Sequence, residues 1–492
     1  MGFILIQYAI VLLVAVVAAT VWRDRYRNAV ITVIEAAGIC EAALGLLQVF
    51  SLAPRKHGIF AITGTFDNPG PFGGFVALVA AVSLSDFLFN RHSRNFRLLF
   101  GISCFIICLI ALVASMSRTA WIAFCFSAVF ILARDVCFRN HFATSLWRPL
   151  ITLIVALICM AGMILLKKDS AIGRIHIWHM ELLAIAEKPL TGYGFGNELG
   201  AYGAAQHDYF ERDHRSNEEK EVAGSPEYAF NEYLGAAESG GIGLFLLMIA
   251  VLTFSICRLR GSPLQSGIRV LAIFSFASYP LSLPEFRIVL TLILGACFFD
   301  ITKPFWKFFL PPLLGFFTVI AIAAYPVANK NHVARGSVIN LYYSSSGMYY
   351  SGLEDELAVY SDIMENDYRF LYEYGWALSR AGRYEDSNAV LTKGIKKSSD
   401  PMFYNLMGIN YWACGNYEEA SSCFTYASFM VPSRLFPHVL QMEMALDYGK
   451  VQDAIIISEN IMSLPINLKN HDMVALREKA AVIIDALKNR AD

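Results

Sequence analysis

Residues 98–116 read LLFGISCFIICLIALVASM, a run that contains no charged side chain. Backbone amides must find hydrogen-bond partners inside a bilayer, and an unbroken apolar run does so as a helix. Nineteen helical residues extend over about 28 Å, close to the roughly 30 Å hydrocarbon thickness of a membrane. The run therefore predicts a transmembrane helix. Ser117-Arg118-Thr119 follows it, with almost no loop before the next apolar run.

Nine more apolar runs share this character, so we predict an all-α, polytopic membrane protein of about ten transmembrane helices. Of the 492 residues, 56% are hydrophobic and 16% are charged, and the mean hydropathy is +0.47. We interpret the first run as a retained span and not as a signal peptide, because no basic segment precedes it. The predicted spans lie at 3–21, 29–52, 70–89, 98–116, 119–133, 149–166, 231–256, 267–282, 287–302 and 305–325.

Basic residues of the short loops orient these spans, since cytoplasmic loops are rich in Lys and Arg. One alternating set of loops holds fourteen: Arg23, Arg25, Arg27, Arg91, Arg94, Arg97, Arg134, Arg139, Arg148, Arg258, Arg260, Arg269, Lys303 and Lys307. The opposite set holds four: Arg55, Lys56, Arg118 and Arg287. We therefore expect the N-terminus, the long loop 167–229 and the C-terminal region on the outer side.

The C-terminal region repeats itself. Three pairs of residues are separated by 33 positions: Gly375 and Gly408, Gly382 and Gly415, and Tyr384 and Tyr417. The middle unit resembles the tetratricopeptide pattern, in which small residues let two helices approach and large residues fill the space. Its matching residues are Tyr404, Met407, Gly408, Tyr411, Ala420, Phe424, Ala427 and Pro432. We predict a transmembrane domain at 1–330 and a soluble helical domain of about three tetratricopeptide-like repeats at 331–492.

Two predicted outer motifs contain an arginine. Arg118 occupies the tight hairpin, where it either extends to the interface or grips a phosphate through its planar guanidinium. Arg174 opens an amphipathic stretch of the long loop, which suits a helix on the membrane surface. An arginine at a helix start opposes the macrodipole, and a bound anion would compensate for this. A solvated surface arginine is the alternative.

Other polar residues lie near the starts of spans. Gly64 to Gly70 predicts either a functional turn or a simple helix start capped by Asn68 or Asp67. Asn231 and Glu232 begin the seventh span, and Glu238 follows inside it before Gly240 to Gly243. Close helix packing is the simpler explanation of these glycines. Arg287 either pairs with Glu285 or joins an anion site.

Several classes of site find no support. His176 and His179 form only a weak metal pattern, and HExxH, P-loop and GxSxG motifs are absent from the sequence. A net charge of −1 argues against nucleic acid as a partner. We therefore expect no metal, no cofactor and no nucleic acid.

In their order along the chain, these motifs resemble the O-antigen ligase and polymerase superfamily of bacterial envelope enzymes, over about 60–300. A tetratricopeptide tail is a known companion of that superfamily. The matching residues are Gly64-Thr65-Phe66, Asn68-Pro69, Ser117-Arg118, Ala120-Trp121, Gly173-Arg174, Trp178, Lys188-Pro189-Leu190, Gly192, Gly194, Asn231-Glu232-Tyr233-Leu234, Glu238 and Gly240 to Gly243.

The resemblance implies transfer of a glycan from an undecaprenyl-diphosphate carrier to an acceptor hydroxyl, on the periplasmic face of the inner membrane and without a metal. The acceptor is a lipid A core, a growing glycan or a protein. Arg118 and Arg174 match the superfamily's arginines and would bind the diphosphate, and topology alone adds Arg287. Asn231 and Glu232 complete the predicted catalytic set.

One position departs from the superfamily pattern. Ligases of the superfamily carry a histidine directly before the asparagine of this motif, whereas this chain has Phe230. Glu232 or a histidine of the long loop would then take the proton, or no base is needed.

Two other functions compete with the transferase. A non-catalytic envelope scaffold, which docks protein partners through its repeats, fits the missing histidine. A transporter would show paired inverted halves, which the spans do not display.

Overall fold

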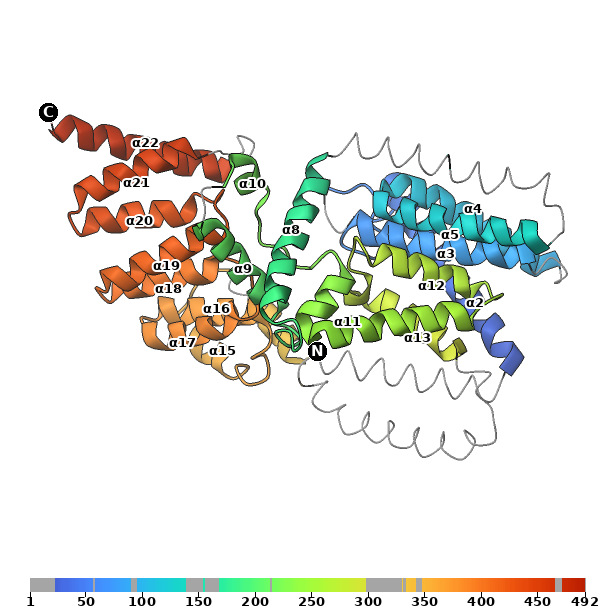
Figure 1. Ribbon diagram of the computed structural model, residues 1–492. Coiled ribbons are helices and arrows are strands. Elements are labelled where there is room, and N and C mark those ends of the chain that lie inside the picture. Colours follow the sequence, from blue (N-terminus) through green and yellow to red (C-terminus); the bar gives the residue numbers. More distant parts are fainter. Residues whose placement is uncertain are drawn as a thin grey trace. The chain divides into compact units, whose positions relative to one another are not determined.

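A computed structural model describes residues 23–55, 58–89, 95–138, 154, 168–212, 215–297, 330, 333–341, 347–464 and 471–491. Every regular element among these residues is a helix, which confirms the predicted all-α class (Figure 1). The predicted spans 3–21 and 305–325, and 149–166 apart from residue 154, lie outside the described residues.

Contacts divide the chain into two compact units. Unit 1 comprises Met1–Ala171, Phe230–Tyr233 and Phe245–Ala328. Unit 2 comprises Ile172–Ala229, Leu234–Leu244 and Asn329–Asp492. The long loop thus belongs to the same unit as the C-terminal helices.

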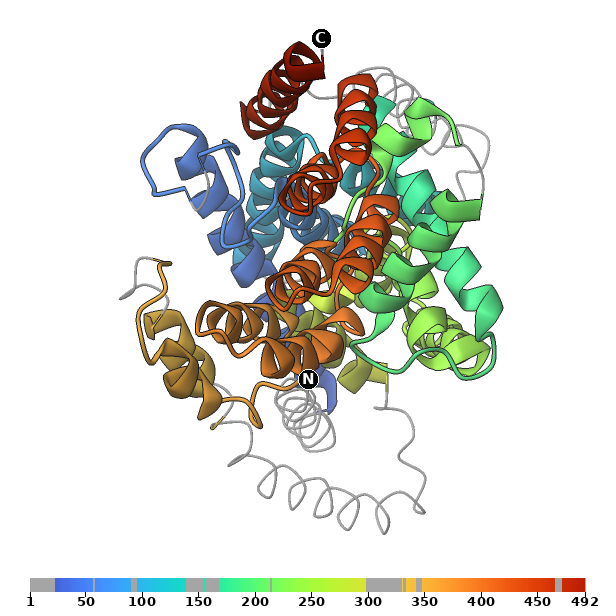
Figure 2. The ribbon, with the colours of Figure 1, turned by 90° about the vertical axis from the view of Figure 1, so that its left-hand side faces the viewer.

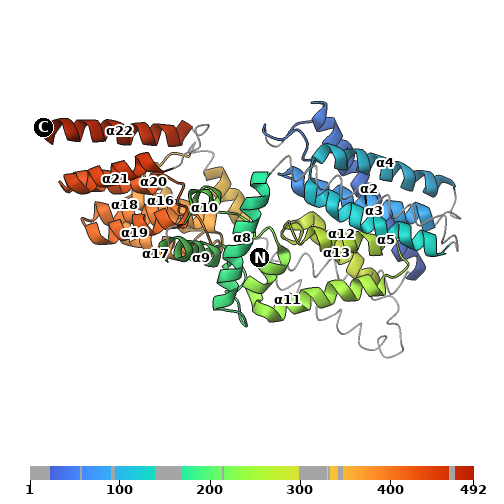
Figure 3. The same cartoon turned by 45° about the horizontal axis from the view of Figure 1, so that its top comes forward.

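Unit 1 is a bundle built around α3 (Pro69–Phe89), which is buried from Pro71 to Asp86. Small residues allow this burial, since a Cβ on Gly74 would meet the ring of Phe274 at 2.3 Å. Around α3 pack α2 (Arg23–Val49), α4 (Asn95–Ser115), α5 (Arg118–Phe138) and α12 (Leu264–Phe274) (Figure 3).

Among the described residues, four helical segments are long and apolar enough to cross a membrane, which supports a helical membrane protein. They are Tyr26–Val49, Pro69–Phe89, Phe96–Ser115 and Glu232–Arg258.

Two spans differ from the prediction. The expected span 267–282 is only the short helix α12, which ends at Phe274 and is followed by turns and the 3-10 helix η1 (Pro280–Ser282). Pro280 lacks a backbone N–H and restricts Tyr279, so one regular helix does not continue through this position. The span predicted at 231–256 is α11 (Glu232–Arg258), which breaks at Gly240 and Gly241. The helix α13 (Pro284–Cys297) follows η1.

The C-terminal part of unit 2 is a series of helical hairpins (Figure 2). They are formed by α16 (Tyr368–Arg380) with α17 (Tyr384–Ile395), α18 (Met402–Ala413) with α19 (Tyr417–Met430), and α20 (Phe436–Asp447) with α21 (Val451–Ser463). The short helix α15 (Leu353–Ala358) packs on α16, and α22 (His471–Ala491) packs on α21.

The hairpins follow the spacing seen in the sequence. Gly382, Gly415 and Gly449 lie in their turns with φ of 78°, 82° and 68°, values that favour glycine. A Cβ on Gly375 would lie 2.7 Å from Leu391, and one on Gly408 would lie 2.4 Å from the ring of Phe424. The predicted role of the small residues is therefore present, and assignment to the tetratricopeptide class stays a prediction.

The long loop forms three helices: α8 (Lys168–Glu187), α9 (Glu198–Arg212) and α10 (Asn217–Val222). Charged residues are dense from His207 to Glu221, a composition typical of mobile segments. Instead, α9 packs on α19, and a capping box of Ser216 and Glu219 begins α10. The charged residues of this segment cap a helix or lie on the surface. Their high density therefore does not predict disorder in this segment.

Replacing Gly408 with alanine should destabilise the repeat domain by about 1–3 kcal/mol, because the new methyl overlaps the buried Phe424 ring. Thermal unfolding of the full-length protein, followed by circular dichroism, measures this as a lower melting temperature. Gly336→Ala is the matched control, because a Cβ there meets nothing within 4 Å. Equal melting of both variants would contradict the packing role of Gly408.

Candidate functional site

The turn before α3 is held by two polar side chains of α2. Glu41 accepts hydrogen bonds from the Thr65 backbone N–H (2.7 Å) and the Thr65 hydroxyl (3.0 Å). Gln48 accepts from the N–H groups of Thr63 (2.9 Å) and Gly64 (2.8 Å) and donates to the Gly64 carbonyl. Gly64 has a φ of 58°, and a Cβ on it would overlap the Glu41 carboxylate. Glu41, an acid inside an apolar run, thus fixes this turn.

The turn leads into α3 beside the arginine hairpin. Asn68 accepts a hydrogen bond from the Gly70 N–H at 2.8 Å, so the simpler prediction of a capped helix start is confirmed. The Ser117 hydroxyl donates to the Gly70 carbonyl at 3.4 Å, and a Cβ on Gly73 would collide with Ser117. The structure therefore brings the first two sequence motifs together.

Arg118 is the first residue of α5 and is half-buried. Met116, in the turn before it, adopts a φ of 51°. A guanidinium at this position adds its charge to the positive end of the helix dipole, so the local field favours an anion. The argument that the sequence suggested for Arg174 therefore applies to Arg118.

An aromatic cluster packs against the turn before α3. The Phe66 ring is 5.8 Å from Phe75 and 6.0 Å from Phe286, and Phe286 stacks on Phe274 at 5.9 Å. The cluster joins the turn before α3 to α12 and α13. Tilted and stacked rings at these separations fix the positions of the turns above them.

Asn231, Glu232 and Arg287 also come together in unit 1. Asn231 caps α11 by accepting the Tyr233 N–H at 3.0 Å. Glu232 Oε1 accepts the N–H groups of Leu281 (2.5 Å) and Ser282 (3.1 Å). Arg287 Nε donates to the Leu281 carbonyl. All three residues thus position η1 and the start of α11, a structural role that the sequence did not suggest.

Phe230, in the place of the superfamily's histidine, has a φ of 52°. Its ring lies edge-on to Tyr279, with centroids 5.2 Å apart. A bulky side chain in the left-handed region is strained, so this position is set by its surroundings and not by local preference.

In unit 2, the break in α11 receives the turn that follows α8. The Tyr193 N–H donates to the Glu238 carbonyl (2.8 Å), and the Gly194 N–H donates to the Ser239 carbonyl (2.9 Å). The Ile242 N–H donates to the Pro189 carbonyl at 2.8 Å. A Cβ on Gly241, whose φ is 67°, would lie 2.2 Å from the Leu190 carbonyl oxygen. Close packing thus explains these glycines.

Two carboxyl groups are buried beside this junction. Glu181 of α8 and Glu238 of α11 are each 1% exposed. Each has one oxygen that accepts no hydrogen bond from the described residues. Burial, and then the charge of Glu238, raise the pKa of Glu181 well above its ordinary range. An ionisable side chain of an amphipathic helix is usually exposed, whereas Glu181 is buried.

Arg174 belongs to unit 2 and is half-buried. Since α8 begins at Lys168, Arg174 lies in the second turn of the helix and not at its start. The predicted opposition to the macrodipole therefore does not apply to it.

In the part of the chain that the structure describes, one group of side chains is close enough together to hold a metal ion, and it lies on α9. His207, Asp208 and Glu211 offer ligand atoms that all lie within 4.8 Å of one another. His207 Nδ1 is 3.0 Å from Asp208, and its ring stacks on Tyr426 at 3.6 Å. This stacking explains the burial of the histidine by packing alone. His176, the other buried histidine of the loop, bonds to Gln206 at 3.0 Å.

Glu181→Gln should raise the melting temperature at about pH 7 and leave it unchanged at about pH 4. The native carboxyl binds its proton more tightly than the unfolded one, so stability falls as the pH rises above the unfolded pKa of about 4.3. Glutamine removes this loss. Thermal unfolding at the two pH values tests it, with the exposed Glu211→Gln as control. A pH-independent difference would show that Glu181 is not the titrating group.

Comparison with known proteins places the motifs in context. A comparison with curated proteins gives no match. Residues 103–249 match the family model described as O-antigen ligase. The match covers Arg118, Arg174, Asn231 and Glu232, whereas Arg287 lies beyond it. This match supports a relationship of the chain to the O-antigen ligase-like superfamily and, in general terms, a membrane glycosyltransferase-like function.

Proposed function

We propose that this protein transfers a glycan from an undecaprenyl-diphosphate carrier to an acceptor hydroxyl on the periplasmic face of the bacterial inner membrane. The observation that carries the proposal is the O-antigen ligase match over the region that contains Arg118 and Arg174. The acceptor is a lipid A core, a growing glycan or a protein.

The chemistry requires positive charge at the outer membrane surface. A lipid diphosphate departs as an anion, and fixed donors aimed at that charge lower the barrier. Arg118, at the positive end of α5, suits this role best. Arg174 is the second diphosphate ligand in the proposal. Arg287 is the third candidate, and its Nε donates a hydrogen bond to the Leu281 carbonyl beside η1.

The surface of α8 supports a location at the membrane. Ile172, Ile175 and Leu182 are 52%, 63% and 53% exposed, although all three are apolar. An exposed apolar stripe on a helix is typical of a segment that lies in the lipid interface. This placement would bring Arg174 of the same helix to the level of the lipid diphosphate.

A carboxylate takes the acceptor's proton in this proposal, because Phe230 has no basic atom. Glu232 and Glu238 are the candidates at the start of α11. Glu232 Oε1 is held by two backbone N–H groups. Glu238 Oε1 is buried without a hydrogen bond from the described residues. Separate replacement of each by glutamine distinguishes them.

The alternative is a non-catalytic envelope scaffold that binds protein partners through its helical hairpins. Phe230 in the place of the superfamily's histidine favours this alternative. The two functions differ in their need for the arginines: loss of Arg118 or Arg174 should impair glycan transfer if the protein is a transferase, and should not if it is a scaffold.

Arg118→Ala and Arg174→Ala should each lower glycan transfer by about 100-fold, the usual cost of losing a donor to the transition-state anion. Complementation of a deletion strain, read out as lipopolysaccharide, capsule and glycoprotein profiles, measures this. Arg118→Lys should rescue only in part, because it keeps the charge and loses the planar fork. Arg212→Ala is the control, since Arg212 is exposed on α9. Full rescue by both alanine variants at normal protein levels would eliminate the transferase proposal.

The periplasmic position of unit 2 gives a second prediction. Cys414 is an exposed free thiol at the end of α18. A membrane-impermeant maleimide, applied to intact spheroplasts, should label the protein, and Cys414→Ser should remove most of the label. Cys257, exposed near the predicted cytoplasmic end of α11, should react only after lysis. Labelling of Cys414 only after lysis would overturn the proposed orientation.

A further inference from the structure

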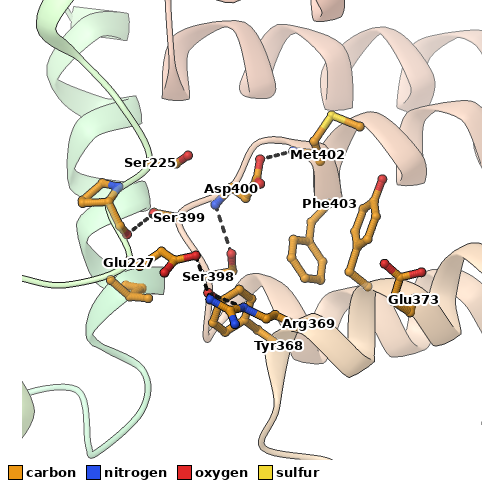
Figure 4. A pocket seen from close by; sticks show the side chains of 13 residues that line it. Ser225, Glu227, Tyr368, Arg369, Glu373, Ser398, Ser399, Asp400, Met402 and Phe403 are labelled. Atoms are coloured by element: carbon orange, nitrogen blue, oxygen red, sulfur yellow. Dashed lines mark hydrogen bonds and ion pairs between the residues drawn. The ribbon is translucent and has the colours of Figure 1, made fainter. Parts of the chain in front are cut away.

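Unit 2 contains a cavity of about 540 Å³ between the end of the long loop and the first two helical hairpins (Figure 4). Ser225 to Glu227 line it from the loop. The opposite side is lined by residues of α16, of the segment that leads into α18 and of the start of α18, namely Tyr368, Arg369, Tyr372, Glu373, Ser398, Ser399, Asp400, Met402 and Phe403. Its size lies within the range of small-molecule sites. Arg118, Arg174 and the junction at α11 do not belong to it.

Most of the charge in this cavity is already neutralised. Arg369 pairs with Glu227 at 2.7 Å, and Arg434 pairs with Asp400 at 2.9 Å. Glu373 has no ion pair or hydrogen bond among the described residues, and burial raises its pKa. A ligand of this cavity is therefore expected to bring a hydrogen-bond donor to Glu373.

Aromatic rings and hydroxyl groups form the rest of the wall. Tyr372 lies edge-on to Phe403 at 5.3 Å, and Tyr368 stands beside Arg369. The Ser399 hydroxyl donates to the Pro226 carbonyl at 3.2 Å, which fixes the loop against the repeats. Apolar ring surfaces with a few placed polar groups are the usual composition of a small-ligand site.

These features select among ligands. A diphosphate would meet the unpaired carboxylate of Glu373, so the cavity does not suit the donor's head group. A purely apolar ligand would leave that carboxylate buried without a partner. A sugar ring presents hydroxyl donors and apolar C–H faces together. Its hydroxyl groups would donate to Glu373, and its C–H faces would pack on the aromatic rings.

We infer that this cavity binds neutral sugar units of a glycan acceptor. The inference rests on the proposed glycan transfer and assigns the acceptor's recognition to the surface shared by the long loop and the hairpins. A polypeptide is the rival ligand. It is disfavoured because two of the three carboxylates already hold arginines, which leaves little negative field to attract a basic segment.

The test uses the full-length protein in lipid nanodiscs, since maltoside detergents carry the sugar chemistry in question. The probes are an array of neutral hexose and N-acetylhexosamine oligosaccharides, matched uronic-acid oligosaccharides, and basic peptides. We expect the protein to bind neutral glycans. Glu373→Lys and Tyr368→Ala should weaken this binding at least about tenfold, and Glu373→Gln, the variant that best preserves volume, by a smaller factor.

Glu385→Lys and Tyr384→Ala on α17 are the matched controls, because neither residue lines the cavity, and both should bind as the unaltered protein does. Absence of neutral-glycan binding, or equal binding by the Glu373 and Glu385 variants, would overturn the inference. Peptide binding that the cavity variants abolish would assign the site to a polypeptide. No donor is present in the assay, so its failure is distinct from a failure of the arginine test.

Discussion

The break in α11 is the constraint on which the proposed site depends. A helix that crosses a membrane ordinarily satisfies its own backbone, yet Gly240 and Gly241 interrupt α11. The released groups bond to the turn from Pro189 to Gly194 instead. This backbone exchange ties the long loop to a membrane helix without relying on side chains. Gly241 has a positive φ, and a Cβ added to it would overlap the Leu190 carbonyl oxygen. Only glycine therefore fits at this position.

The second attachment of the loop is made by α9. A Cβ on Gly200 would lie 2.3 Å from the Lys396 carbonyl oxygen, and Gln206 donates to the Met430 carbonyl. The helical hairpins are therefore part of what shapes the loop, and not a separate module on a tether. In the proposed function, the hairpins therefore help to position the long loop that carries Arg174, in addition to forming part of the cavity proposed to bind the acceptor.

Patterns of local origin were predictable from the sequence, and those set by tertiary contacts were not. Apolar runs predicted α3 and α4, and the glycine spacing of 33 predicted the hairpins, because length and small residues act locally. The start of α8 was misplaced, so the dipole argument was attached to Arg174 when it belongs to Arg118. The burial of Glu181 was not predictable from local sequence, because Glu238, the second buried carboxyl group, is far away in sequence. The cavity between Ser225 to Glu227 and the first two hairpins was not predictable either, because its two sides are far apart in sequence.

Phe230 carries a consequence for how this chain relates to ligases of the superfamily. Its left-handed backbone costs a bulky residue on the order of 1–2 kcal/mol, whereas histidine and asparagine adopt that conformation several-fold more often. The backbone at this position thus suits a histidine better than a phenylalanine, and the Phe230 ring packs edge-on against Tyr279. Histidine at position 230 would therefore meet less backbone strain than phenylalanine does.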